Sequence, residues 1–563
     1  MQKIILQTVI TFLSIAVLSS MTFAASDTDS DLDVELQKDV LMGPGQVMIE
    51  TKSDILMSYG ARARIIPVSE TDWDFGLTDN LTMPLLGGGL KSNFFKTHIT
   101  ETGWIENNYI RSEVQMYYTA MPRDRIWSFY AALEYDRPLE NSSVDDRGGK
   151  DQNTSNFGLE RLHGTFKLPA NMRLHAGFDI WGVDVIDAAG LVYGDDNPGF
   201  WVTGDYDKWS FNVGYFKLLE NNFKANVNEL SDQEDSDRDL YGGYLTFTPE
   251  DGQKFQPFYM YDRIRDVPVG NLFNYITKTT GDTPKTDSHH IGAYYTGKFG
   301  VMELFLEGVY QFGNADDTGL AQDDFDISAY AFSGDLALKL DESAGFGVKP
   351  HIGFLYTSGD DDPTDDELGG YTGIENAQRF SQYFGGENTI IGDTNLVLGS
   401  VLYGYLPELY GNGTPIATGG LQNGAGKFGN GRGDNPGLTM TSVGITLTPK
   451  RFLIFRSNVN SFWWNEDISV YGFVLPTPTS LPAITTVEAG YTGTEWDNEI
   501  TLATSKHSFI KGQFSCFFPG DTVEDVTSAL TAYRNPDNPL DIIPGAKSDD
   551  VIYRLGMEFI WMF

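Results

Sequence analysis

Apolar and polar residues alternate with a period of two along most of the chain. The run 109–120 places Ile110, Met116 and Tyr118 on one face and Glu113 and Gln115 on the other. Successive side chains of a β-strand point to opposite faces, so each such run predicts a strand with one apolar face. Nineteen runs have this pattern, and 199–206 and 395–408 are the weakest of them. They are 55–67, 109–120, 127–135, 157–169, 172–181, 199–206, 208–219, 238–248, 254–266, 288–299, 301–312, 325–340, 346–358, 395–408, 437–449, 451–463, 494–506, 507–518 and 550–563.

The number and length of these runs suit a single closed sheet. After residue 24 no run of about 18 apolar residues occurs, so the sequence offers no membrane-spanning helix. In lipid every backbone N–H and C=O must find a partner, which leaves a closed barrel as the alternative. Because bacterial barrels use even strand numbers, we expect an all-β, transmembrane antiparallel barrel of about 18 strands within residues 54–563. Long extracellular loops rich in Gly, Asp, Asn and Pro are expected at 137–156, 221–237, 268–288, 359–394, 410–436 and 519–548.

The last strand separates a membrane barrel from a soluble sheet. Its apolar face carries Tyr553, Phe559, Trp561 and the terminal Phe563. Chain ends usually fray into water, so a wholly apolar face at this position is unusual for a soluble protein. A terminal aromatic residue that closes an alternating strand is similar to the assembly signal of Gram-negative outer-membrane barrels; the alternative is the edge strand of a secreted sandwich. We expect interfacial girdles from Trp104, Trp127, Trp201, Trp209, Trp463 and Trp561.

The N-terminus indicates export. A basic start at Lys3, a mostly apolar run over 4–18 and small residues before a cut after Ala24 predict a signal peptide over 1–24, with a membrane anchor as the alternative. Residues 25–53 are acidic and are expected to form a periplasmic tail or a plug. The expected location is the outer membrane of a Gram-negative bacterium. The expected partners there are outer-membrane lipid and the barrel-assembly machinery.

Composition excludes several classes of function. The 563 residues include 78 acidic and 39 basic side chains, a formal charge of −39, which disfavours a nucleic-acid binder. The single Cys516 excludes a disulfide framework, haem attachment and Cys-rich metal motifs, and no cofactor is expected. Cys516 alternates with Phe514 and Phe518, so we expect it to face lipid. No Gly-x-Ser-x-Gly or similar motif assigns catalytic residues, so the chain is not expected to be an enzyme.

A barrel of about 18 strands is wide enough for an aqueous lumen, so its inward side chains become the candidate site. When the apolar half of each strand faces outward, the inward positions hold more bases than acids, although acids dominate the whole chain. The expected selectivity residues for an anionic solute are Arg62, Arg64, Arg111, Arg161, Lys167, Arg173, Lys349 and Arg554, and further inward bases are Lys298, Lys339, Arg456 and Lys511. Alternatively, these bases pair with inward acids and brace the wall. The run 255–265 has no clear phase, which leaves Arg263 and Arg265 unassigned.

The middle of the chain also carries a family resemblance. Asp-Ile-Ser-Ala-Tyr at 326–330, then a strand begun at Pro350 that ends in Ser-Gly-Asp and continues to Asp-Pro, resembles alginate-export-type outer-membrane barrels. Arg62, Arg64 and Arg161 are similar to the arginines of that family's early strands. The resemblance implies a channel of roughly 18 strands that passes an anionic uronate polysaccharide outward through a basic lumen. The chain departs from that pattern in its inward acids and in the aromatic residues Tyr130 and Trp181.

Three functions therefore remain open. The first is a channel for anionic small solutes or an anionic polysaccharide. The second is a sheath that holds a protein partner reached from the periplasm, such as an electron-carrying cytochrome, and the third is a general structural or receptor barrel. The weak metal candidates Asp360, Asp361, Asp362 and Asp365 could bind Ca²⁺, but they lack the regular spacing of a calcium loop and suit a solvated acidic loop.

Overall fold

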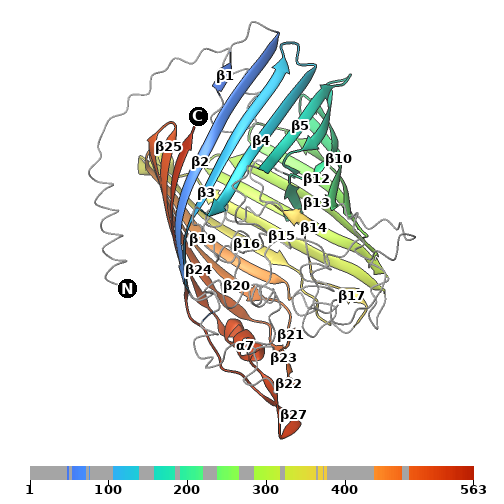
Figure 1. The fold of residues 1–563 in the computed structure, drawn as a ribbon, viewed down its shortest axis with the longest axis vertical. Coiled ribbons are helices and arrows are strands. Elements are labelled where there is room, and N and C mark those ends of the chain that lie inside the picture. Colours follow the sequence, from blue (N-terminus) through green and yellow to red (C-terminus); the bar gives the residue numbers. More distant parts are fainter. Residues whose placement is uncertain are drawn as a thin grey trace. The chain divides into compact units, whose positions relative to one another are not determined.

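Eighteen antiparallel strands form one sheet that closes on itself (Figure 1). This computed structural model describes residues 47–49, 54–71, 75, 106–138, 158–183, 191–219, 238–265, 285–316, 324–362, 365–371, 373–376, 436–471 and 481–563. The ring closes where β2 (Ile55–Thr71) pairs with β28 (Ile552–Met562), so that Arg62 lies opposite Met562 and Thr71 opposite Tyr553. Closure leaves the sheet without a free edge along this wall, as the transmembrane barrel prediction requires. The predicted fold and strand number are confirmed.

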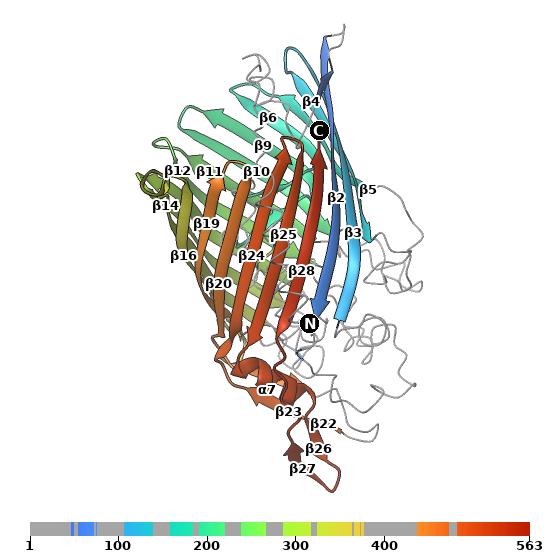
Figure 2. The ribbon, with the colours of Figure 1, turned by 90° about the vertical axis from the view of Figure 1, so that its left-hand side faces the viewer.

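The ring follows the order of the sequence. Each strand pairs with the next ring strand along the chain, and β28 returns to β2 (Figure 2). Between β2 and β28 the ring strands are β3 (Glu106–Pro122), β4 (Trp127–Pro138), β5 (Gly158–Lys167), β6 (Met172–Phe178), β9 (Pro198–Tyr206), β10 (Trp209–Leu219), β11 (Arg238–Phe247), β12 (Gln253–Ile264), β13 (Lys285–Phe299), β14 (Met302–Asp316), β15 (Phe325–Leu338), β16 (Gly347–Thr357), β19 (Leu438–Lys450), β20 (Leu453–Trp464), β24 (Tyr491–Ser505) and β25 (Ser508–Pro519).

Eighteen of the nineteen predicted runs correspond to ring strands. The weak run 199–206 is β9, and the weak run 395–408 lies outside the described residues. The expected signal peptide, nearly all of the acidic N-terminal segment and most of the expected loops also lie outside them. The period of two therefore located the strands well, because each strand is solvated on one face and apolar on the other.

The two ends of the barrel differ in their connections. At one end, here called the short-turn end, consecutive strands join through 123–126, 168–171, 207–208, 248–252, 300–301, 339–346, 451–452 and 506–507. Gly300 adopts a φ of 61° in one of these turns, a conformation that favours glycine. The C-terminus lies at the same end, where Phe563 and Ala61 exchange backbone hydrogen bonds of 2.9 and 3.0 Å. The other connections are at the opposite end, here called the loop end.

Smaller elements sit around the ring. The helix α7 (Asp521–Leu530) and the sheet of β22 (Leu481–Pro482), β26 (Tyr533–Asn535) and β27 (Asn538–Ile543) project beyond the loop end (Figure 2). Among the described residues no helix is both long and apolar enough to cross a membrane. The remaining elements are β1 (Val47–Ile49), β7 (Trp181–Gly182), β8 (Tyr193–Asp195), α5 (Asp341–Ala344), β17 (Glu367–Leu368), β18 (Glu375–Asn376), β21 (Ile468–Tyr471) and β23 (Ile484–Val487).

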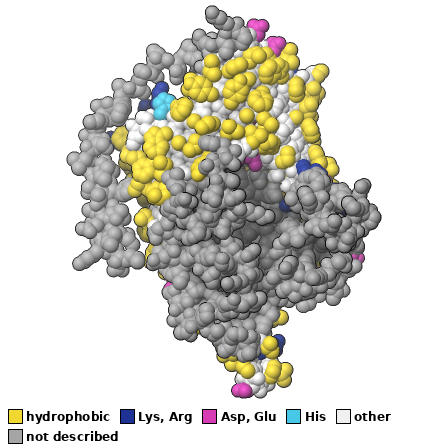
Figure 3. Space-filling model, viewed as in Figure 1, with side chains coloured by type: hydrophobic (Ala, Val, Ile, Leu, Met, Phe, Trp, Pro, Cys, Tyr) yellow, Lys and Arg dark blue, Asp and Glu magenta, His cyan; other side chains and the backbone are white. Residues whose placement is uncertain are grey.

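The outer wall is apolar, as the strand pattern predicts. Figure 3 shows hydrophobic side chains over most of the described barrel wall seen from that side. On β28, Tyr553, Leu555, Trp561 and Phe563 are between 42% and 51% exposed, while Glu558 on the opposite face is buried. Side chains of this size in such numbers on one surface indicate contact with lipid.

Two predictions about the outer wall need correction. Trp201 does not belong to a girdle, because it is buried on the inner face of β9, and Trp104 lies outside the described residues. Cys516 alternates outward as expected, but it is only 2% exposed, with its Sγ 4.0 Å from the Trp496 carbonyl oxygen. Its direct cross-strand neighbours on the same face, Trp496 on β24 and Tyr553 on β28, are both much larger than the thiol.

Candidate functional site

Two arginines on the inner face of β2 share one carboxylate. Arg62 donates to Glu113, and Arg64 donates from Nη1 to the second oxygen of Glu113 at 2.8 Å. Arg64 also donates from Nη2 to Glu558 at 2.9 Å, which ties β2 to β28 across the closure of the barrel. Both carboxylates are almost fully buried, whereas both arginines are partly exposed. For Arg62 and Arg64 this pairing favours the interpretation as braces of the wall.

The pairing continues around the wall. Lys511 Nζ lies 3.8 Å from both Glu558 and Glu499, and Arg456 Nη1 lies 3.8 Å from Glu499. Opposite charges therefore alternate over six adjacent strands from β3 to β20. In order they are Arg62, Glu113, Arg64, Glu558, Lys511, Glu499 and Arg456.

The inner face of β5 and β6 carries a pair of bases of a different kind. Lys167 and Arg173 lie directly opposite each other in the register of these strands. Arg173 donates to Thr165 Oγ1 at 2.9 Å, and among the described residues neither base has a carboxylate within 4.0 Å. Two bases side by side without a carboxylate leave an excess of positive charge at this point of the wall.

Lysines gather on the inner face of β13 and β16 and at the end of β15. Glu303 has Lys349 Nζ at 2.5 Å and Lys298 Nζ at 3.9 Å, and Lys339 Nζ lies 3.8 Å from Asp341. The side chain of Lys298 is 68% exposed, so its charge faces water despite the ion pair.

These bases belong to one zone of the lumen. They point inward and lie within four residues of the short-turn end of their strands, and together we call them the basic rim. The basic rim consists of Lys167, Arg173, Lys254, Lys298, Lys349, Arg456 and Lys511. The inward acids of the same zone on the described strands are Asp205, Glu303 and Asp335, together with Glu499 and Glu558, which lie directly opposite Arg456 and Lys511 in the strand register. The zone therefore has an excess of positive charge.

The wall nearer the loop end is not basic. Glu495 and Asp497 point inward from β24, with Asp497 fully buried and accepting a bond of 3.0 Å from Asn460. The sequence assignment of inward acids omitted both, although they alternate with the outward Trp496. The expected basic excess of the whole lumen is therefore confined to the short-turn end in the described wall.

Two segments line the inner wall of β10 to β14. Trp181 packs on Phe216 with ring centroids 4.7 Å apart and donates from Nε1 to Asn212 at 2.7 Å. Leu191 donates its N–H to Glu307 Oε1 at 2.9 Å, which fixes the segment 191–195 to β14. The segment that contains β7 and β8 therefore occupies part of the lumen and narrows it.

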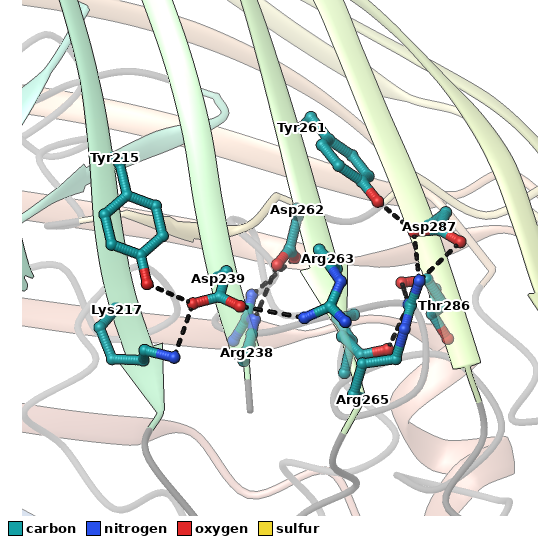
Figure 4. Close-up of polar contacts among 11 residues, drawn as sticks. Tyr215, Lys217, Arg238, Asp239, Tyr261, Asp262, Arg263, Arg265, Thr286 and Asp287 are labelled. Atoms are coloured by element: carbon teal, nitrogen blue, oxygen red, sulfur yellow. Dashed lines mark hydrogen bonds and ion pairs between the residues drawn. The ribbon is translucent and has the colours of Figure 1, made fainter. Parts of the chain in front are cut away.

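The segment 367–376 joins the first one there. Tyr371 donates its hydroxyl to the Leu191 carbonyl at 2.7 Å, and Ile374 donates its N–H to the Val192 carbonyl at 2.8 Å. Burial raises the pKa of the Tyr371 hydroxyl well above its ordinary value, so the group remains a donor. Arg238 binds Asp262 through two bonds of 3.0 and 2.9 Å and also donates to the Ile374 carbonyl (Figure 4).

Sequence reasoning missed a stack of three rings on β5, β6 and β9. His163 and His175 stack at 5.1 Å, and Trp201 lies 4.9 and 5.0 Å from them. His163 Nε2 is 2.9 Å from His175 Nδ1, and His175 Nε2 is 2.9 Å from Thr203 Oγ1. The clue was present in the alternation of β9, which puts Trp201 on the face opposite Phe200.

The predicted selectivity residues fall into three groups. Arg62, Arg64, Arg161 and Lys349 have carboxylate partners, those of Arg161 being Asp179 at 3.8 Å and Asp196 at 3.6 Å. Lys167 and Arg173 lie together in the basic rim, as described above. Arg554 is buried in the inner face of β28, and the side chain of Arg111 lies outside the described residues.

The candidate metal ligands form a turn. Asp360, Asp361, Asp362 and Asp365 follow β16, and Asp365 Oδ1 accepts the N–H of Glu367 at 2.8 Å. In the described part of the chain no group of three or more His, Cys, Asp or Glu side chains is placed to hold a metal ion.

Comparison with known proteins gives structural neighbours only. No family model matches the chain, and no curated protein matches it. Similar solved structures include a BenF-like porin from Pseudomonas fluorescens Pf-5, at 10% identity over 90% of this chain and 99% of that chain with a TM-score of 0.44. They also include OccK8 (OprE) of Pseudomonas aeruginosa, at 12% identity over 90% and 98% with a TM-score of 0.43. A third is OccAB2 of Acinetobacter baumannii, at 10% identity over 90% and 98% with a TM-score of 0.44. At these values the similarity carries no information about residues or solute.

Proposed function

We propose that the chain is an outer-membrane, porin-like channel that prefers anionic solutes. The observation that carries this proposal is the basic rim, in which Lys167 and Arg173 stand together without a carboxylate among the described residues. An excess of one charge sign at a mouth raises the local concentration of the opposite sign, so anions enter more readily than cations.

The exposed apolar wall and the closed sheet support the membrane location. A barrel of this kind places its short turns in the periplasm and its long loops outside the cell. The basic rim then surrounds the periplasmic mouth, and the segments fixed to Glu307 and Arg238 narrow the lumen between that mouth and the loop end.

Exposure distinguishes the charges that a solute meets from those that brace the wall. Lys298 and Lys349 keep 68% and 44% of their side-chain surface exposed, whereas Glu495 and Asp497 have 1% and none of theirs. Of these four residues, a solute can therefore contact the two bases but hardly the two acids. Small organic anions suit this arrangement, and the resemblance to alginate-export barrels adds an anionic uronate polysaccharide as the larger solute of the same charge.

Recordings from purified protein in a planar bilayer test the proposal. With a salt gradient across the bilayer, we expect discrete conductance steps and a reversal potential that indicates anion preference. Cation preference would overturn the selectivity, and a barrel without conductance that co-purifies with a cytochrome would support the sheath function instead.

A further inference from the structure

A row of stacked rings crosses the outer face of β10 to β14 near the loop end. Its members are direct cross-strand neighbours, and consecutive ring centroids are 5.1, 5.8, 4.6 and 5.1 Å apart. In order they are Tyr215, Tyr241, Tyr261, His289 and Phe312. Below the row, toward the short-turn end, Val213 and Ile291 are more than half exposed on the same face. The row therefore marks the margin between acyl chains and headgroups.

A charged row runs parallel to it, two residues closer to the loop end. Lys217, Asp239, Arg263 and Asp287 are also direct cross-strand neighbours, so their charges alternate (Figure 4). Asp239 has Lys217 Nζ at 2.8 Å and Arg263 Nη1 at 3.1 Å, and Arg265 Nη2 lies 3.0 Å from Asp287.

The aromatic row is bonded to the charged row. Tyr215 donates its hydroxyl to Asp239 at 2.8 Å, and Tyr261 donates its hydroxyl to Asp287. Asp239 and Asp287 therefore bond both to the tyrosine hydroxyls of the aromatic row and to the bases of the charged row. These bonds fix the positions of the bases. With Arg265, which follows β12, the cluster holds three bases and two acids. Lys217 and Arg263 each keep 24% of their side-chain surface exposed and Arg265 keeps 18%, against 6% for Asp239 and 25% for Asp287. The charge accessible from outside is therefore positive.

We propose that Lys217, Arg263 and Arg265 bind a phosphorylated headgroup of an outer-leaflet glycolipid. Guanidinium and ammonium groups are the strong donors for phosphate oxygens, and this row holds them at the level where such headgroups lie. The acyl chains of the bound lipid pack on the exposed aromatic and aliphatic side chains below. On the neighbouring strands the same row continues with Asn314 and Asp326, so in the described wall the basic part is confined to β10–β12. The inference rests on the membrane location under the proposed function but not on anion preference.

Binding of lipid A to the detergent-purified full chain, measured by native mass spectrometry, tests the site. The variant Lys217→Gln/Arg263→Gln should bind about 30-fold more weakly, since each base near a lipid surface contributes several-fold. The matched control Arg451→Gln/Lys506→Gln removes two bases from short turns and should bind as the wild type does. Dephosphorylated lipid A should bind the wild type as weakly as lipid A binds the first variant, and inorganic phosphate at equal concentration should not compete.

If the first variant does not assemble, a second variant that makes the charged row more positive tests the same proposal. Asp287→Asn removes an acid from the row, so lipid A should bind about fivefold more tightly. Equal binding of lipid A to wild type, Asp287→Asn and the double variant would overturn the site, as would equal binding of the two lipid forms. Competition by inorganic phosphate would show a free-anion site instead. Bilayer conductance of the double variant should be unchanged, which separates failure here from failure of the channel function.

Discussion

Lys167 and Arg173 face each other across β5 and β6 on the inner wall of the barrel, with no carboxylate within ion-pair distance of either in the described residues. Directly opposed like charges destabilise a strand pair by a few tenths of a kcal/mol to about 1 kcal/mol. At the mouth of the lumen, an anion that passes between the two bases reduces this repulsion. These two bases are therefore better candidates for selectivity than bases that already have partners.

The first prediction concerns this pair. Lys167→Glu/Arg173→Glu should lower the anion-to-cation permeability ratio at least about twofold, because the charge of the basic rim falls at its uncompensated point. The measurement is the reversal potential in a salt gradient. The control Arg451→Glu reverses a charge in a short turn and should leave the ratio near that of the wild type. An unchanged ratio in the double variant would remove the pair from the selectivity mechanism.

The second prediction concerns Arg64, which bridges Glu113 and Glu558. Arg64→Met leaves two buried carboxylates with one base fewer and should destabilise the barrel by about 3–5 kcal/mol. The midpoint of heat-induced unfolding, followed by the shift between folded and unfolded forms in gel electrophoresis, measures the loss.

The same experiment decides between the two interpretations of the early arginines. If Arg62 and Arg64 brace the wall, adding Glu113→Gln and Glu558→Gln to Arg64→Met should restore much of the stability, with little change in ion preference. If they instead select anions, Arg62→Glu/Arg64→Glu should lower anion preference while the barrel still assembles. A large change in reversal potential with an unaltered unfolding midpoint would contradict the bracing interpretation.

The sequence predicted the wall of the barrel better than its lumen. Alternation such as that of Tyr553, Leu555 and Met557 is a local property, so it locates strands and their outward faces without any knowledge of neighbours. Ion pairs such as Arg64 with Glu558 join residues 494 positions apart and depend on which strands become neighbours when the ring closes. The sequence therefore supplied the candidate bases but could not show which of them have partners.

The faces of the run 255–265, and with them the direction of Arg263, also depend on contacts made only in the folded barrel. The run 255–265 has apolar residues on both faces, because Phe258 and Met260 pack against inward segments while Phe255 and Tyr259 face outward. Arg263 consequently could not be assigned from sequence, and the structure places it on the outer face beside Asp239.

The third prediction concerns the C-terminus. Phe563 exchanges backbone hydrogen bonds with Ala61, and its ring is exposed on the outer face beside the other aromatic residues of β28. Deleting Phe563 removes both the last pairing and the terminal aromatic residue, so the yield of heat-modifiable barrel should fall several-fold. Phe563→Leu keeps the backbone pairing and an apolar side chain, and should retain an intermediate yield. Normal assembly of the deletion variant would argue against a C-terminal assembly signal.

The fourth prediction concerns the segments that narrow the lumen. Glu307 Oε1 accepts the Leu191 N–H at 2.9 Å, and Tyr371 donates to the carbonyl of the same Leu191. Glu307→Ala removes the acceptor that fixes residue 191 to β14, so the segment should move away from the wall for part of the time. Single-channel recordings should then show larger current fluctuations and a changed mean conductance, while the reversal potential stays near that of the wild type because the basic rim is intact.

A matched substitution on the same strand separates this effect from general damage to the wall. Gln311 also points inward from β14, and its Nε2 donates to Ser288 on the adjacent strand at 3.0 Å, a bond within the wall. Gln311→Ala should therefore leave the current as steady as in the wild type. Equal fluctuations in the two variants would mean that loosening of β14, not release of the inward segment, alters the current. Steady current in Glu307→Ala would mean that packing of Trp181 on Phe216 holds the segment without the bond to Leu191.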